Sequence, residues 1–152
     1  MIEFTLNGKA VAVEADPDTP LIYVLRNSLD AKSVRYGCGL EQCGCCTVLV
    51  DGETAFACSA TVGAVAGKAV ETVEGEGAAD APGPIQAAFL AEQAGQCGYC
   101  LSGMIMATKA LLAKTPKPSR DEIVEALDGN LCRCGAHARI VRAVERAAEA
   151  LA

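Results

Sequence analysis

The sequence predicts an α+β fold in which strands dominate the first half of the chain and helices the second. Apolar and polar residues alternate in short runs up to about residue 73, whereas beyond residue 84 apolar residues recur at helical spacing. Residues 74–84 are polar and rich in glycine and proline, which is typical of a linker. We therefore expect one domain over residues 1–75, a linker over 76–84 and a second domain over 85–152.

The chain is expected to open with a β-hairpin and a short helix. The alternating runs 2–6 and 10–14 are separated by Asn7-Gly8, a dipeptide that favours a tight two-residue turn. Pro20 then suits the first position of a helix, and the apolar residues after it predict one short helix over residues 20–25.

A long loop and further strands are expected after this helix. Residues 32–46 are rich in glycine and cysteine and show no regular pattern. The run 47–50 and the turn Asp51-Gly52 indicate a second hairpin, whose other strand lies around Phe56. A last strand is expected near residues 69–73.

Four helices are expected in the second half. Ser119 and Glu122 form a capping box at the start of one of them. Each helix has an apolar seam, so the four pack most simply as a small bundle. They are predicted over residues 84–94, 101–113, 119–127 and 137–151.

The composition indicates small cores that gain stability from bound metal. The 152 residues include no tryptophan and only six other aromatic residues (three Tyr, three Phe), so little large apolar surface is available. The formal net charge is -6, and no run of Lys and Arg is present that would neutralise phosphates. Nucleic acid is therefore not an expected partner.

Neither a secretory signal nor a membrane span is predicted. The first residues lack a basic region followed by an apolar one. No uncharged stretch reaches the roughly 18 apolar residues of a spanning helix. We expect a cytoplasmic location, with export alongside a signal-bearing partner as an alternative. In a reducing compartment, the nine cysteines are more typical of metal binding than of disulfides.

Four cysteines of the first half have the spacing of an iron-sulfur site. Cys38, Cys43 and Cys46 follow the pattern C-x4-C-x2-C, and Cys58 supplies a fourth thiol, which is the plant-type [2Fe-2S] arrangement. Neighbouring glycines let backbone N–H groups approach the cluster sulfurs. The alternatives are disulfides or a structural zinc site, although zinc favours paired C-x2-C knuckles. Cys45 does not fit the spacing and is interpreted as a small buried side chain.

Four cysteines of the second half form another candidate site. Cys97 and Cys100 form C-x2-C just before one predicted helix, and Cys132 and Cys134 form C-x-C shortly before another. Helix N-termini carry unpaired N–H groups that favour thiolates and an anionic cluster. This set on its own also suits zinc, but a chain that already carries one [2Fe-2S] site favours a second cluster here.

No catalytic site of its own is predicted. An acid-base or acyl-transfer site needs a positioned base, and the only histidine, His137, is interpreted as a solvated residue at a helix start. Tyr36 and Tyr99 are interpreted as packing residues beside the clusters. The chemistry is therefore expected to belong to the clusters and to a partner.

With these motifs placed, the whole chain resembles the iron-sulfur subunit of the molybdenum hydroxylases, the xanthine dehydrogenase and aldehyde oxidoreductase family. One departure is Cys45, where many relatives have a small residue such as Ala; it leaves the assignment of Cys46 as a ligand intact but makes the choice between Cys45 and Cys46 worth testing. The ending Cys134-Gly-Ala-His-Ala-Arg-Ile is similar to members that oxidise N-heteroaromatic compounds and aldehydes. The segments that carry the resemblance are Tyr36-Gly-Cys-Gly-Leu-Glu-Gln-Cys-Gly-Cys-Cys-Thr-Val, Gln96-Cys-Gly-Tyr-Cys-Leu-Ser-Gly-Met and Gly129-Asn-Leu-Cys-Arg-Cys-Gly.

This resemblance implies a β-grasp plant-type ferredoxin domain followed by a small four-helix [2Fe-2S] domain. It implies that Gln96 contacts the pterin of a molybdenum-pterin cofactor held by a separate large subunit. Electrons are expected to pass through the helical cluster to the plant-type cluster and then to a partner, such as a flavin (FAD) subunit or a haem-containing cytochrome subunit. The substrate is expected to be hydroxylated with oxygen from water.

Three hypotheses follow for the function. The first is an electron-relay subunit in a permanent complex with a molybdenum-pterin subunit, which is not itself the catalyst. The second is a free-standing two-cluster ferredoxin that shuttles electrons between transient partners. The third is a zinc-stapled interaction module, which would be colourless because zinc sites do not absorb visible light.

Overall fold

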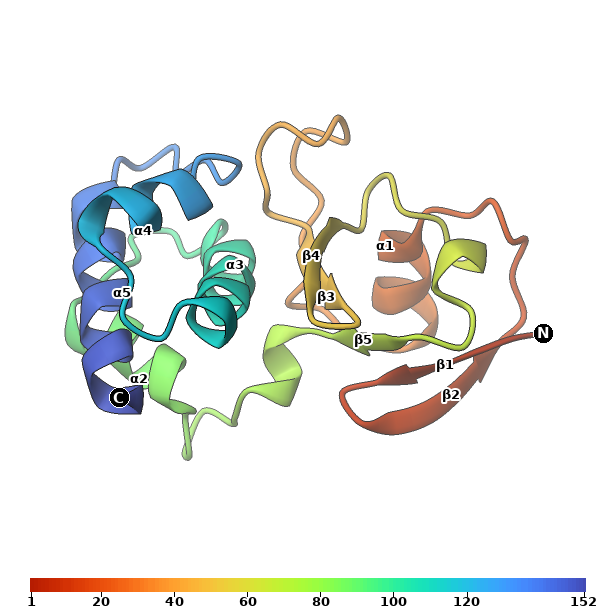
Figure 1. The fold of residues 1–152 in the computed structure, drawn as a ribbon. Coiled ribbons are helices and arrows are strands. Elements are labelled where there is room, and N and C mark those ends of the chain that lie inside the picture. Colours follow the sequence, from red (N-terminus) through yellow and green to blue (C-terminus); the bar gives the residue numbers. More distant parts are fainter.

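A five-stranded sheet forms the centre of the N-terminal half of the computed structural model, which describes all 152 residues (Figure 1). The order of the strands across the sheet is β2-β1-β5-β3-β4. All neighbouring strands are antiparallel except β1 and β5, which are parallel. The strands are β1 (Ile2–Leu6), β2 (Lys9–Val13), β3 (Thr47–Val50), β4 (Glu53–Phe56) and β5 (Ala69–Glu71).

Both predicted hairpins are confirmed. The β1–β2 turn has positive φ at Asn7 (50°) and Gly8 (78°), and the β3–β4 turn has the same pattern at Asp51 (51°) and Gly52 (83°). Two successive residues with positive φ are what a two-residue hairpin turn of matching twist requires, and Asn-Gly and Asp-Gly adopt them most readily.

The short helix of the first half is longer and wider than predicted. It begins as α1 (Leu21–Tyr23) and continues as a π-helical turn over Val24–Ser28. Its apolar face packs on the sheet, and it forms one core with the inner residues of β1, β2, β3 and β5. Two short 3-10 turns, Gly63–Val65 and Val73–Gly75, lie before and after β5 and were not predicted.

Four α-helices make up the C-terminal half, as predicted. The Gln86 side chain accepts a hydrogen bond from the Gly83 N–H (2.8 Å) at the first of them. That helix ends three residues earlier than predicted, because Gln93 adopts a left-handed φ of 47°, which a helix cannot continue through. The helices are α2 (Pro84–Ala91), α3 (Leu101–Lys114), α4 (Arg120–Ala126) and α5 (His137–Leu151).

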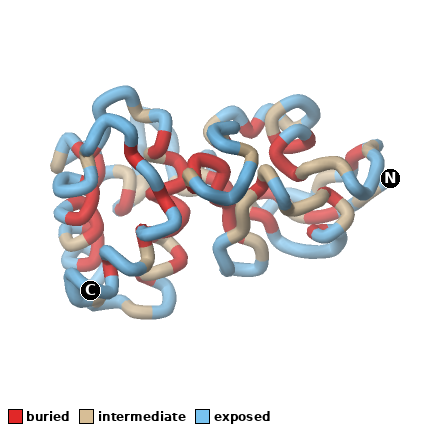
Figure 2. Tube along the Cα trace, turned by 90° about the horizontal axis from the view of Figure 1, so that it is seen from above, coloured by how far each residue is buried: buried red, intermediate tan, exposed pale blue.

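Each half has its own core, and a third cluster joins the two. Buried stretches are present in both halves of the chain trace (Figure 2). Leu49 of β3 packs with Met106 and Ala110 of α3, while its neighbour Val48 faces the core of the N-terminal half. Strand β3 is therefore buried on both faces, which explains its continuous apolar run. The division into residues 1–75, 76–84 and 85–152 stays a prediction.

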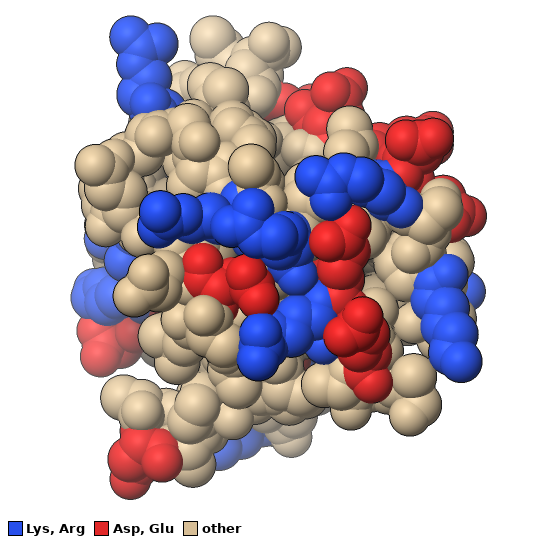
Figure 3. All heavy atoms as spheres, turned by 90° about the vertical axis from the view of Figure 1, so that its left-hand side faces the viewer, with Lys and Arg blue, Asp and Glu red and all other residues tan.

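The outer face of the helical half carries ion pairs. Basic and acidic side chains are interleaved there (Figure 3). Arg142 and Arg146 of α5 both contact Glu92, and Arg120 contacts Glu145. No helix has the length and apolar content that crossing a membrane requires.

Candidate metal centres

The long loop between the π-helical turn and β3 carries three thiols of the first set. The Sγ of Cys38 accepts hydrogen bonds from the N–H groups of Leu40 and Gln42, each at 3.3 Å. The Cys38 N–H in turn donates to the Sγ of Cys43 (3.3 Å), so these two cysteines lie side by side. The loop thus directs backbone donors at sulfur, as an iron-sulfur loop requires.

The fourth thiol of this set approaches from the end of β4. The Ala57 N–H donates to the Cys46 carbonyl oxygen (3.2 Å), and this brings the next residue, Cys58, against Cys46, whose thiol interacts with it. The first set therefore consists of two pairs, Cys38 with Cys43 and Cys46 with Cys58.

The thiols of this loop differ in their environments. Hydrogen bonds, foremost from the Leu40 N–H, lower the pKa of Cys38 to about 7, because they stabilise the thiolate. Burial raises the pKa of Cys46 to about 12.

Cys45 is a small buried side chain, as predicted. Only 6% of it is exposed, and it packs in the core of the helical half although it belongs to the N-terminal loop. Burial raises its pKa to about 12. Its thiol is next to Gly37, where an added Cβ would lie 3.3 Å from the Cys45 Sγ and 2.5 Å from the Cys43 Sγ. This loop therefore needs glycine at position 37.

The second set also consists of two pairs. The Sγ atoms of Cys97 and Cys134 are 3.5 Å apart and exposed, whereas Cys100 and Cys132 are buried and their thiols interact. The Tyr99 N–H donates to Cys97 (3.5 Å) and the Ala136 N–H to Cys132 (3.4 Å). The N–H donor at Tyr99 lowers the pKa of Cys97, whereas burial raises that of Cys100 to about 12.

The paired thiols fit a two-iron cluster. Two thiolates on one tetrahedral metal with bonds of about 2.3 Å lie roughly 3.7 Å apart, close to the separation of Cys97 and Cys134. Nowhere do three or more His, Cys, Asp or Glu side chains gather in a group that would hold a single metal ion. Each half instead has two thiol pairs with N–H donors beside them, an arrangement that would suit one pair on each iron of a [2Fe-2S] cluster.

The two loops that carry the thiols contact each other directly. The Leu131 N–H, next to Cys132, donates to the Cys43 carbonyl oxygen (2.8 Å). The buried Asn130 side chain donates to the Gly44 carbonyl oxygen (3.1 Å). The sequence analysis did not assign a role to Asn130, although this residue lies two residues before Cys132 in the segment Gly129-Asn-Leu-Cys-Arg-Cys-Gly.

Tyr36 and Tyr99 lie beside the thiols but differ from their prediction as packed residues. Their exposed fractions are 44% and 46%. The Tyr36 ring stacks on Tyr23, and the Tyr99 hydroxyl donates to the Tyr36 carbonyl oxygen (2.5 Å). They therefore join surface segments to one another rather than fill a core.

His137 is exposed at the first position of α5, as predicted. Its Nε2 also accepts a hydrogen bond from the Cys132 N–H (3.3 Å), a contact that its position in the sequence did not indicate. This contact holds the segment that carries Cys132 and Cys134 against the start of α5.

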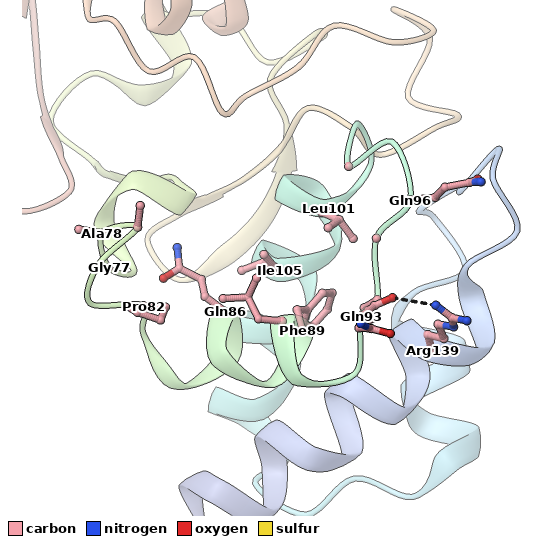
Figure 4. A pocket seen from close by; sticks show the side chains of 15 residues that line it. Gly77, Ala78, Pro82, Gln86, Phe89, Gln93, Gln96, Leu101, Ile105 and Arg139 are labelled. Carbon is pink, nitrogen blue, oxygen red and sulfur yellow. Dashed lines mark hydrogen bonds between the residues drawn. The ribbon is translucent and has the colours of Figure 1, made fainter.

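Gln96 lies at the edge of an open groove with a volume of about 810 Å³ (Figure 4). The apolar part of the groove is formed by side chains such as Phe89, Leu101 and Ile105, and the exposed Gln96 side chain extends away from Phe89 and Ile105. Arg139 donates to the Gln93 carbonyl oxygen (3.4 Å) on the same rim, as the dashed line shows. Gln96 directly precedes Cys97, so a molecule bound at this rim would be adjacent to the second thiol set.

A strand-rich domain and a helical domain, each with four paired thiols, define a protein with two iron-sulfur sites. Residues 4–69 match the model of the 2Fe-2S iron-sulfur cluster binding domain, and residues 72–145 match that of the [2Fe-2S] binding domain.

Known proteins resemble the chain over its whole length. It is 52% identical to a nicotinate dehydrogenase subunit of Pseudomonas putida, over 97% of this chain and 94% of that protein. It is 51% identical to the alpha subunit of isoquinoline 1-oxidoreductase of Brevundimonas diminuta, over 98% of both. The structure of the aldehyde oxidoreductase from Desulfovibrio desulfuricans matches with a TM-score of 0.95 and 39% identity, over 99% of this chain and 17% of that longer chain.

The chain belongs to the family of iron-sulfur small subunits of the molybdenum hydroxylases, which includes the xanthine dehydrogenase iron-sulfur subunits. It is therefore a non-catalytic subunit of an oxidoreductase, with two [2Fe-2S] binding domains. The β-grasp ferredoxin domain and the helical domain expected from the sequence are confirmed.

Proposed function

We propose that this chain relays electrons, one at a time, from a large molybdenum-pterin subunit to a separate acceptor. Hydroxylation with oxygen from water converts R–H and H2O into R–OH, two protons and two electrons. A [2Fe-2S] cluster accepts one electron at a time, so each turnover sends two electrons in succession through the chain. The pairwise arrangement of the eight thiols is the observation that carries this proposal.

The proposed ligands follow the thiol pairs. In the N-terminal domain, Cys38 and Cys43 bind one iron, and Cys46 and Cys58 bind the other. In the helical domain, the corresponding pairs are Cys97 with Cys134 and Cys100 with Cys132. The separation of 3.5 Å between the Cys97 and Cys134 sulfurs and the N–H donors at Cys38, Cys97 and Cys132 support this assignment.

The proposed route runs from the helical cluster to the plant-type cluster. The 2.8 Å hydrogen bond between the Leu131 N–H and the Cys43 carbonyl oxygen supports a direct connection between the two clusters. Cys43 is a proposed ligand of the plant-type cluster, and Leu131 directly precedes Cys132, a proposed ligand of the helical cluster. A short connection of covalent bonds and one hydrogen bond thus joins the two sites without a gap through solvent.

The large subunit is proposed to bind over the groove beside Gln96. The groove is apolar and open, and exposed apolar side chains such as Leu90 (67% exposed) line it, which suits a protein interface. The free amide of Gln96 at the rim is then available to hydrogen-bond the pterin of the molybdenum cofactor.

We propose an N-heteroaromatic compound as the substrate of the assembled enzyme, with an aldehyde as the alternative. The relatives that are about half identical to this chain are named as nicotinate and isoquinoline oxidising enzymes, whereas the aldehyde oxidoreductase is less similar. The acceptor is proposed to be an FAD or haem group in a further subunit.

The test is to purify the tagged chain with its native companions under anaerobic conditions. We expect about four irons per chain, molybdenum in a co-purifying large subunit, and two distinct electron paramagnetic resonance signals after reduction with dithionite. A fully loaded chain without a molybdenum-containing companion would favour the free-standing ferredoxin. Zinc in place of iron, or a single cluster signal, would overturn the two-cluster relay itself.

A further inference from the structure

Arg35 reaches from the N-terminal domain to the loop that carries the second thiol set. It lies three residues before Cys38, and its backbone N–H donates to the Cys45 carbonyl oxygen (3.3 Å). Its side chain points the other way: Nη1 donates to the Gly98 carbonyl oxygen (2.6 Å). Its guanidinium carbon also lies 5.3 Å from the centre of the Tyr99 ring. Gly98 and Tyr99 are the two residues between Cys97 and Cys100.

The positive charge of Arg35 is not neutralised by a carboxylate. The arginines on the outer face of the helical domain, Arg120, Arg142 and Arg146, each form an ion pair with a glutamate. Arg35 forms none, and its partners are a carbonyl oxygen and an aromatic ring, which leave its full charge in place. The side chain is partly buried, so solvent screens this charge less than that of an exposed arginine.

We propose that Arg35, a residue of the plant-type domain, raises the reduction potential of the cluster in the helical domain. This inference rests on the proposed function, which puts a [2Fe-2S] cluster on Cys97, Cys100, Cys132 and Cys134. Reduction adds one negative charge to a cluster that is already anionic, so a fixed cation beside Cys97 stabilises the reduced form more than the oxidised form. The cluster that first receives electrons from molybdenum is thereby made a better acceptor.

The contacts of the Arg35 guanidinium favour an effect on the helical cluster. Arg35 is close to Cys38 along the chain, but its guanidinium is held at Gly98 and Tyr99. Arg133 and Arg139 also lie near the second thiol set, but both are exposed and belong to the helical domain. Arg35 is therefore the partly buried cation by which one domain acts on the cluster of the other.

The test is a redox titration of the complete complex, with each cluster followed by its own electron paramagnetic resonance signal. The signal of the helical cluster is assigned as the one that a C134S variant alters. In R35Q, which keeps a hydrogen-bonding amide but loses the charge, we expect the ratio of reduced to oxidised helical cluster at a fixed potential to fall about tenfold. For a one-electron couple this is about 59 mV.

Three variants separate charge from contact. R35K keeps the charge without the planar fork and is expected to restore most of the shift. Y99F removes the hydroxyl contact with Tyr36 and leaves the charge, so the potential is expected to stay unchanged. R120Q loses the same charge on the outer face and is expected to have no effect on either cluster.

The outcomes distinguish this inference from the function on which it rests. If both cluster signals are present and the ratio of reduced to oxidised helical cluster in R35Q stays within twofold of the wild-type ratio, the role of Arg35 is overturned and the relay is left intact. An equal shift of both clusters, or a shift in Y99F as large as that in R35Q, would also overturn it. Absence of a second cluster signal in the wild-type complex would instead overturn the proposed function.

Discussion

Gly103 of α3 lies against Gly44 of the first thiol loop, backbone to backbone. A Cβ added at Gly103 would lie 1.9 Å from the Gly44 carbonyl oxygen, far inside any possible contact distance. Gly44 sits between Cys43 and Cys45 and itself has a φ of 70°. The position of one proposed cluster loop is therefore set by how closely a helix of the other domain approaches it.

A G103A substitution is expected to lower the free energy of unfolding by about 1–3 kcal/mol, because backbone must move to admit the methyl group. The measurement is denaturant unfolding of the loaded chain. S102A is the matched control on the same helix: the buried Ser102 hydroxyl has no hydrogen-bond partner, so its removal is expected to leave stability unchanged or raised. Equal stability of G103A and wild type would contradict the close approach.

Asn130 is the polar counterpart of this contact. Its Nδ2 donates to the Gly44 carbonyl oxygen (3.1 Å) and to the Thr47 hydroxyl (3.4 Å), and only 7% of the residue is exposed. N130A is expected to cost about 1 kcal/mol, since the Thr47 hydroxyl still donates to the same carbonyl. N130D is expected to cost more, because a buried carboxylate then faces that carbonyl. Unfolding curves that rank N130D as the milder change would refute this arrangement.

The local elements of the fold were predictable because each carries its own signal. Asn7-Gly8 and Asp51-Gly52 have the positive φ values that their turns need, and Ser119 and Glu122 form the expected capping box. The parallel pairing of β1 with β5 joins residues more than sixty positions apart, and no short-range pattern encodes it. The end of α2 was missed because the left-handed Gln93 is not a typical stop signal.

The proposed sites likewise have a part that local sequence indicates and a part that depends on tertiary packing. Spacing alone indicated which cysteines form each set, whereas the pairing of Cys97 with Cys134 depends on how two separate segments of the helical domain meet. The roles of Arg35 and Asn130 were not identified from the sequence, since each contacts the other domain through a single side chain, although Asn130 lies in a motif segment two residues before Cys132. Contacts between domains are set by tertiary packing, to which local patterns give no access.

Lys109 of α3 ties the helical domain to the segment after β5. Its Nζ lies 2.5 Å from a carboxylate oxygen of Glu71 and 2.5 Å from one of Glu76. Burial acts to lower the pKa of Lys109, but the two glutamates outweigh it and hold the pKa above its ordinary value. K109M is expected to lower the free energy of unfolding by about 1 kcal/mol, a modest value because the side chains are partly exposed.

The pH dependence of this loss follows from the direction of the shift. A lysine whose folded-state pKa is raised contributes stability that is complete below its unfolded pKa, about 10.4, and is lost only as the pH rises through the folded value. The difference in unfolding free energy between wild type and K109M is therefore expected to be the same at pH 7 and pH 9. The difference is expected to shrink only once the pH rises above about 10.4, and a difference that stays constant above that pH would show that the glutamates do not raise this pKa.

Neighbouring cysteines in the first loop are expected to respond in opposite ways to the same substitution. Cys45 packs in the core of the helical domain, whereas Cys46 lies against Cys58. C45A is expected to retain about four irons per chain and both cluster signals, with only the small loss of stability that follows from removing one buried sulfur. C46A is expected to lose the plant-type signal and about half of the iron, because one iron then lacks a thiolate. Iron analysis with electron paramagnetic resonance of the two variants decides between these residues, and loss of iron in C45A but not in C46A would transfer the ligand role to Cys45.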